Sequence, residues 1–98
     1  MIGDFDFGYD TPPKLLGEIK PEYPEAAKVA GLQGRVDLQV EILRDGSVGD
    51  IYVMRSYPVF EEAAKEAVRK MRFLPGFLED EPVDCRVFIP VEFELDRR

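Results

Sequence analysis

Few residues of this chain could carry out catalysis. Cys85 is the single cysteine and the chain has no histidine, so no imidazole is available to activate the thiol as a nucleophile. Cys85 also falls on the apolar phase of an alternating stretch, which favours a small buried side chain. The lack of histidine removes the side chain that most readily exchanges protons near neutral pH. No catalytic residues are predicted, and we expect a binding or structural protein rather than an enzyme.

The sequence gives equally little support to a metal or cofactor site. The densest acidic cluster, Glu79-Asp80-Glu81, offers oxygen ligands but lacks the alternating spacing of known calcium loops, so a solvated acidic loop is the simpler interpretation. Zinc and iron–sulfur sites need cysteines and histidines that the chain lacks. A net charge of −7 at pH 7 argues against nucleic acid and anionic membranes. We predict no metal, no cofactor and no nucleic-acid partner.

The longest candidate strand, residues 83–95, reads VDCRVFIPVEFEL and suggests a site of another kind. Its odd-numbered residues are all apolar and most of its even-numbered ones are charged, which is the period of a strand with one buried face. Pro90 interrupts it, and a proline without an N–H is confined to edge strands or bulges. An open edge strand can pair with a strand of another protein. Such a guest should find its donors on either side of Pro90, around residues 88–89 and 91–92.

The remaining pattern supplies two helices and two further strands. Alanines before Gly31 predict a short helix over residues 24–30. Alternating residues 35–42 and 47–56 predict a hairpin closed by Asp45-Gly46. An apolar stripe over residues 60–72 predicts the second helix. A right-handed crossover then places the last strand beside the first, which gives an α+β fold: a three-stranded antiparallel sheet of order 2-1-3 with two helices on one face.

Residues 1–12 resemble a tail or linker, and residues 13–98 form the single predicted domain. In the tail, Phe5, Phe7 and Tyr9 alternate with other residues. Two interpretations remain open: a mobile tail with incidental aromatic side chains, or a short strand that docks on the domain.

Several motifs, in their order and spacing, resemble the carboxyl-terminal domain of TonB, the energy transducer of Gram-negative envelopes. The resemblance runs from about Pro12 to Leu95. The matching features are Tyr23-Pro24, Gly34, Asp45-Gly46, the double alanine Ala63-Ala64, Arg72-Phe73 followed by Pro75, and the ending IPVEFEL.

This resemblance implies a periplasmic domain of a protein anchored in the inner membrane, with the anchor and a proline-rich linker absent from this chain. Its partners would be a proton-driven motor complex, reached through the missing amino-terminal region, and outer-membrane transporters for siderophores or vitamin B12. The domain would bind the extended TonB box of a transporter by adding it as a strand beside the last strand. The implied partner-binding residues are Glu22, Tyr23, Pro24, Arg86, Phe88, Ile89, Pro90, Val91 and Glu92.

Other interpretations stay open at this stage. Glu22 stands where some family members have a glutamine that contacts the box, and Tyr23-Pro24 could simply start a helix. Arg86 and Glu92 could form cross-strand ion pairs instead of contacting a partner. The alternative function is a self-associating or envelope-protein interaction module with a TonB-like fold and no transporter partner. A homodimer could then form through the open edge or through apolar residues on the outer sheet face.

Overall fold

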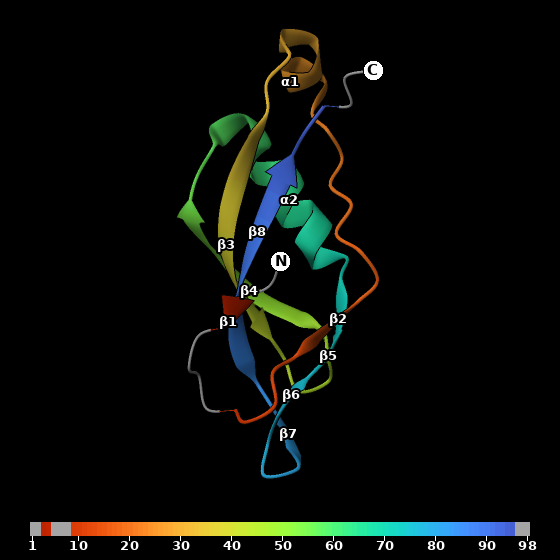
Figure 1. Ribbon diagram of the computed structural model, residues 1–98, viewed down its shortest axis with the longest axis vertical. Coiled ribbons are helices and arrows are strands. Elements are labelled where there is room, and N and C mark those ends of the chain that lie inside the picture. Colours follow the sequence, from red (N-terminus) through yellow and green to blue (C-terminus); the bar gives the residue numbers. More distant parts are fainter. Residues whose placement is uncertain (1–2, 5–8, 96–98) are drawn as a thin grey trace.

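Long antiparallel strands form the centre of the fold (Figure 1). The computed structural model describes residues 3–4 and 9–95. Its elements, in chain order, are β1 (Gly3–Asp4), β2 (Lys14–Leu16), α1 (Glu25–Ala30), β3 (Gly34–Ile42), β4 (Val48–Arg55), α2 (Pro58–Arg69), β5 (Arg72–Leu74), β6 (Gly76–Leu78), β7 (Glu81–Val83) and β8 (Cys85–Phe93). The α+β class predicted from the sequence is confirmed.

The predicted order of the three long strands is confirmed, but the sheet contains one strand more. Its order is β1-β8-β3-β4, so β3 is central between β4 and β8. The β3–β8 register runs without a break from Gly34 opposite Phe93 to Ile42 opposite Cys85. The short β1 pairs with β8 on the other side, with Gly3 opposite Phe88. The sheet is therefore four-stranded, and part of the edge that we expected to be open is covered.

One face of the sheet carries the core. The even-numbered apolar residues of β3 and the odd-numbered residues of β8 point to this face and are buried with Phe60, Ala64 and Val68 of α2. The ring of Phe60 stacks on that of Phe93, with the ring centroids 4.3 Å apart. Beyond the end of α2, the paired strands β2 and β5 continue the same layer and bring Phe73 into the core. Figure 1 shows α2 lying across the sheet and α1 at one end of the molecule.

The predicted helices are present with shifted limits. Helix α1 has Pro24 as its N-cap residue and ends at Gly31, whose φ of 70° is the left-handed conformation expected there. Helix α2 begins at Pro58, earlier than predicted, because proline fits the first turn of a helix. It ends at Arg69, and Arg72 already belongs to β5. The apolar stripe of α2 faces the core as predicted.

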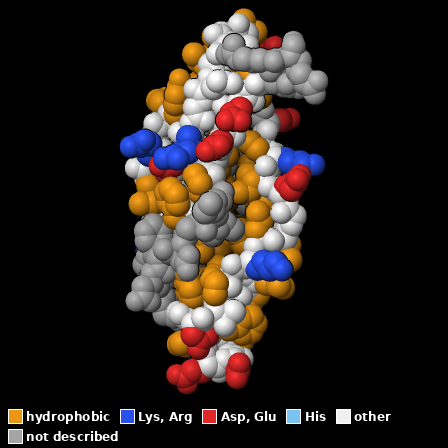
Figure 2. All heavy atoms as spheres, in the orientation of Figure 1, with side chains coloured by type: hydrophobic (Ala, Val, Ile, Leu, Met, Phe, Trp, Pro, Cys, Tyr) orange, Lys and Arg blue, Asp and Glu red, His pale blue; other side chains and the backbone are white. Residues whose placement is uncertain are grey.

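The acidic loop predicted at residues 79–81 is the tip of a small hairpin instead. Strands β6 and β7 pair in register, with Gly76 opposite Val83 and Leu78 opposite Glu81. Glu79 and Asp80 form the turn with φ angles of 50° and 67°. A two-residue hairpin turn normally takes glycine or asparagine at such angles, so this turn carries no strong sequence signal. The hairpin projects at one end of the molecule, where acidic side chains gather (Figures 1 and 2).

The described part of residues 1–12 packs on the domain. The N–H groups of Asp10 and Thr11 both donate to the carbonyl of Phe77, at 2.9 and 3.0 Å. Tyr9 is half-buried against the core. Phe5 and Phe7 lie outside the described residues. Where the chain is described, these contacts favour a docked segment over a mobile tail.

Candidate functional site

The candidate site is the side of β8 that faces away from β3. Strand β1 covers this side at Val87 and Phe88. From Ile89 to Phe93, no strand pairs with this side among residues 3–4 and 9–95. This length is the open stretch of β8. A strand of another protein could therefore pair with it without displacing any described strand.

A small hollow adjoins the open stretch. It has a volume of about 250 Å³ and is lined by Ile19 and Pro21 on one side and by Pro90, Val91 and Glu92 on the other. We call this hollow the edge slot. Ile19 and Pro21 belong to the irregular segment between β2 and α1, which runs beside β8 (Figure 1). A guest strand on β8 would lie against this segment, which makes Ile19 and Pro21 the side-chain wall of the site.

Of the predicted residues on β8, two contribute only their backbone. Ile89 is fully buried and Val91 is 1% exposed, so both side chains belong to the core. Pro90 is half-buried and Glu92 is exposed, and both line the edge slot. The structure thus brings Pro90, Val91 and Glu92 together at one place, where a partner could contact the pyrrolidine ring, the carboxylate and the strand edge.

Arg86 and Phe88 lie apart from the edge slot. The guanidinium of Arg86 lies over the ring of Tyr52, 5.5 Å from its centroid, in a cation–π contact across the outer sheet face. Phe88 is half-buried and lies opposite Gln39 of β3 and Gly3 of β1. A partner could contact both residues only if it extended past the open stretch into the region that β1 covers.

Tyr23 and Pro24 build the corner that starts α1. The Tyr23 hydroxyl donates to the carbonyl of Leu32. Its ring packs edge-on against Phe60 and Phe93, with centroid distances of 5.5 and 5.8 Å. The carbonyl of Pro24 accepts the N–H of Lys28 at 3.0 Å. Both residues therefore hold the segment that carries the wall of the edge slot, whatever further contact they make with a partner.

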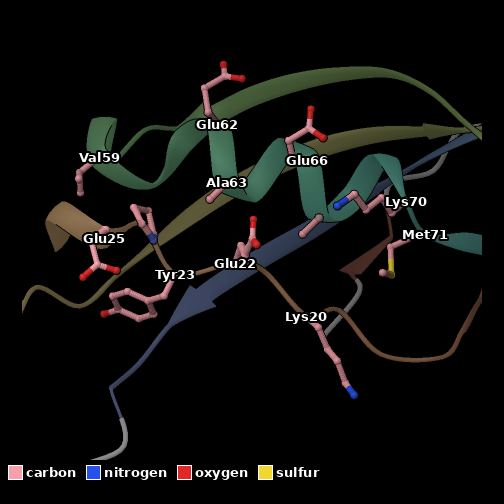
Figure 3. Close-up of a pocket in the computed structure, with 12 residues that line it drawn as sticks. Lys20, Glu22, Tyr23, Glu25, Val59, Glu62, Ala63, Glu66, Lys70 and Met71 are labelled. Carbon is pink, nitrogen blue, oxygen red and sulfur yellow. The ribbon is translucent and has the colours of Figure 1, made fainter. Parts of the chain in front are cut away.

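Glu22, Tyr23 and Pro24 line a second and larger hollow, the α2 trough (Figure 3). Its volume is about 560 Å³, and it lies between α2 and the segment that leads into α1. Residues 19–22 divide the two hollows: Ile19 and Pro21 face the edge slot, whereas Lys20 and Glu22 face the α2 trough. The residues predicted as one site are therefore distributed over two neighbouring hollows.

Cys85 behaves as a buried apolar residue, as predicted. It is 3% exposed, and burial is the main factor that raises the pKa of its thiol. The thiol is therefore protonated at neutral pH and a poor nucleophile. Among residues 3–4 and 9–95, no group of histidine, cysteine and acidic side chains is arranged to hold a metal ion. In the same described part, no helix has the length and apolar character needed to cross a bilayer.

Ile19 and Pro21 are the site residues that the sequence prediction missed. A signal for them exists in the sequence: apolar Ile19 and Pro21 alternate with charged Lys20 and Glu22, as expected for an extended segment with two different faces. Four residues are too few for the alternation to stand out. Only the fold shows that one of these faces meets β8.

Comparisons with known proteins agree with this geometry. A family model described as the Gram-negative bacterial TonB protein C-terminal matches residues 19–95. Protein tonB2 of Pseudomonas aeruginosa is 36% identical over 78 residues, which cover 78% of this chain and 29% of that protein. TonB of Vibrio cholerae is 27% identical over 89 residues, which cover 89% of this chain and 36% of that protein. The chain thus spans about a third of the length of these relatives.

Solved structures show the same relationship. The solution NMR structure of the Pseudomonas aeruginosa TonB CTD superposes with a TM-score of 0.72 at 30% identity, covering 99% of this chain and 97% of that one. The NMR structure of Helicobacter pylori TonB-CTD gives a TM-score of 0.51 at 28% identity, covering 80% of this chain and 72% of that one. Sequence and structure agree, and the chain belongs to the TonB carboxyl-terminal domain family.

Proposed function

We propose that this domain works in the periplasm by binding an extended segment of an outer-membrane transporter, which adds as a strand along β8. The domain would then pass on force that a proton-driven motor complex supplies through the rest of the protein. This role involves binding and no catalysis. The observation that carries the proposal is the open stretch of β8 from Ile89 to Phe93, with the edge slot beside it.

The position of Pro90 defines which backbone groups a guest can use. Pro90 lies opposite Asp37 of β3 and has no N–H to donate. We infer that this is a non-hydrogen-bonded pair of the β3–β8 ladder, so that the ring of Pro90 points to the open side. By alternation, Glu92 directs its N–H and carbonyl to the same side. A guest confined to the open stretch then has three partners: the Pro90 carbonyl, the Glu92 N–H and the Glu92 carbonyl.

These bonds alone give weak binding. Three hydrogen bonds at a net ~1 kcal/mol each do not offset an association cost of at least ~4 kcal/mol. Side-chain contacts must add the rest, and burial of one aliphatic side chain against Ile19 and Pro21 would contribute ~1.5–3 kcal/mol. Weak binding suits a linkage that must release after each cycle of force. Strand addition also loads the backbone bonds together when the guest is pulled along its length.

The test is a titration of the full chain with peptides of about 12 residues taken from transporter amino termini, followed by amide NMR shifts. We expect saturable shifts at Ile89, Val91 and Glu92 of β8 and at Ile19 and Lys20. A peptide of the same composition in scrambled order is the control and should leave these amides unchanged. Shifts confined to β4, the opposite edge of the sheet, would contradict the proposal.

The alternative function, self-association, draws support from a different surface. Tyr52 is 43% exposed and Met54 is 53% exposed on β4, which is the other edge of the sheet. Both side chains lie on the outer face of the sheet, and a homodimer that packs two outer faces together would cover them. Sedimentation of the full chain and of a version that lacks residues 1–11 tests this alternative. Strictly monomeric behaviour of both proteins across the concentration range would exclude it.

A further inference from the structure

The α2 trough has an apolar floor that the proposed strand addition does not use. Its residues on α2, together with Lys70 and Met71 just after the helix, form two rows with four-residue spacing, so each row runs along the helix. The apolar row is half-buried or buried, and it lies across the trough from the segment that carries Glu22 and Tyr23 (Figure 3). It consists of Val59, Ala63, Ala67 and Met71, and the neighbouring charged row consists of Glu62, Glu66 and Lys70.

The shape of the trough suits a helix. The apolar row runs from Val59 to Ala67 for about 12 Å along α2, and Met71 continues it just beyond the end of the helix. The side chains of Ala63 and Ala67 in the middle of the row are small. Another helix could therefore pack against α2 with its axis at the short end of the usual interaxial distance of about 8–10 Å. The volume of about 560 Å³ is enough for a row of inserted side chains. A helix that lies along such a groove uses one apolar face.

Charges are arranged in order along the trough. Glu25 and Glu62 lie towards the start of α2, Glu22 and Glu66 lie further along, and Lys70 lies next to Met71 at the far end (Figure 3). Glu62 and Glu66 already pair with Lys65 and Arg69, at 3.4 and 2.6 Å. Within residues 3–4 and 9–95, Glu22 and Glu25 make no ion pair. The trough therefore has unneutralised acid on the wall opposite α2.

We propose that the α2 trough docks a cationic amphipathic helix of a partner protein, antiparallel to α2. The carboxylates of Glu22 and Glu25, which have no ion partner among the described residues, favour a cationic guest, and the net charge of −7 draws it to the domain from a distance. Helices carry basic residues most favourably in their last turns, so the basic end of the guest lies over Glu22 and Glu25. A second copy of this chain fits less well, because it also carries −7 and the copies repel each other.

This docking site is separate from the strand-binding edge. The two hollows share residues 19–22 as a common wall but open on opposite sides of that segment. A guest strand on β8 and a guest helix on α2 could be held at the same time. Two attachments on one domain would give a tighter linkage than either alone, since the second forms within an existing complex.

The test uses a designed peptide as the probe. It is an amidated helix of about 14 residues, about 20 Å long, with leucine and alanine on one face, glutamate in its first turn and lysine in its last two turns. The full chain is titrated with it at low salt while amide NMR shifts are followed. We expect saturable shifts along α2 and at Glu22 and Glu25. A nitroxide on the peptide's last residue should broaden the amide of Val59 more than that of Met71.

Matched variants separate a specific site from general attraction. Glu22→Gln combined with Glu25→Gln should weaken binding of the probe about fivefold, since two exposed ion pairs are lost. Glu79→Gln combined with Glu81→Gln removes the same charge at the far hairpin and should have little effect. Ala63→Gln raises the trough floor and should abolish binding, while the transporter-peptide titration stays unchanged because β8 is untouched. Circular dichroism confirms that each variant remains folded.

Clear outcomes would overturn the docking proposal. Equal weakening by the two glutamine pairs would show that net charge alone attracts the probe. Shifts located on β8 in place of α2 would place the probe at the strand-binding edge. Stronger broadening at Met71 than at Val59 would reverse the orientation. Trough shifts that grow with protein concentration in the absence of the probe would show that a second copy fills the trough.

Discussion

Two proline substitutions on β8 separate the side that faces β3 from the side that a guest uses. If Glu92 directs its N–H away from β3, Glu92→Pro removes no bond of the β3–β8 ladder, and the protein should stay folded, as it does with Pro90. Val91, by the same alternation, directs its N–H towards β3, and its side chain is buried. Val91→Pro should therefore break a ladder bond and disturb the core packing, and loss of the bond alone should lower the free energy of unfolding by ~1 kcal/mol.

The same phase predicts opposite effects on binding. Glu92→Pro removes one N–H that the domain offers to the guest strand. The loss of this hydrogen bond costs a net ~1 kcal/mol, so the transporter peptide should bind about fivefold more weakly. Pro90→Val adds an N–H donor near the centre of the open stretch, so the same peptide should bind about fivefold more tightly. The two variants should thus differ by about 25-fold in dissociation constant, with the natural protein between them.

Amide NMR titration measures these affinities, and urea unfolding measures the stability of each variant. The natural protein and a Glu94→Gln variant, which changes an exposed residue beyond β8, serve as controls. Unfolding of Glu92→Pro to the same extent as Val91→Pro would show that the assigned phase is wrong. Unchanged peptide affinity in both Glu92→Pro and Pro90→Val would refute strand addition at this place.

Three further predictions concern other parts of the molecule. Removal of residues 1–8 should uncover the part of β8 that β1 now pairs with, so peptides long enough to reach it bind about tenfold more tightly in NMR titrations, while shorter peptides bind as before. Glu79→Asn with Asp80→Gly should raise the free energy of unfolding by ~1 kcal/mol, because both positions have positive φ; an unchanged melting temperature would contradict this. Ser56→Ala should raise the pKa of Glu61, which the Ser56 hydroxyl now lowers by donating to the carboxylate at 2.6 Å. The stabilisation from this bond is present above the ordinary carboxyl pKa and is lost as the pH falls through the lowered value, so only the natural protein should show it in acid unfolding curves.

The elements of the fold that follow local sequence patterns could be predicted. Alternation in β3 and β8, the Asp45-Gly46 turn and the apolar stripe of α2 each depend on residues close in the chain. The order of the long strands then followed from the handedness of one crossover. Pro90 lies on a stretch of β8 that pairs only with β3 among the described strands, as expected of proline, although β1 covers the same side of β8 nearer its start.

Contacts between distant segments could not be predicted in the same way. Strand β1 has only two residues, too few for a period to appear, and it pairs with β8 from the other end of the chain. The β6–β7 turn uses Glu79 and Asp80 at positive φ, where no local preference points to a hairpin. These contacts depend on the packing of the whole domain, which single-segment patterns do not describe.

The candidate site shows the same division. The sequence predicted that Pro90, Val91 and Glu92 belong to a binding edge, and in the structure these three residues line the edge slot. The opposing wall of Ile19 and Pro21 depends on how the segment before α1 crosses the molecule. That crossing is fixed by tertiary contacts such as the packing of Tyr23 against Phe60 and Phe93.

Hydrogen exchange of the β8 amides in the free protein and with a saturating transporter peptide tests strand addition most directly. We predict that the Glu92 amide exchanges rapidly in the free protein and at least about tenfold more slowly in the complex, because the guest then accepts its N–H. The amides of Ile89 and Val91 should be protected in both states by their bonds to β3. A Glu92 amide that is already protected in the free protein, or one that stays fast with the peptide bound, would contradict strand addition along β8.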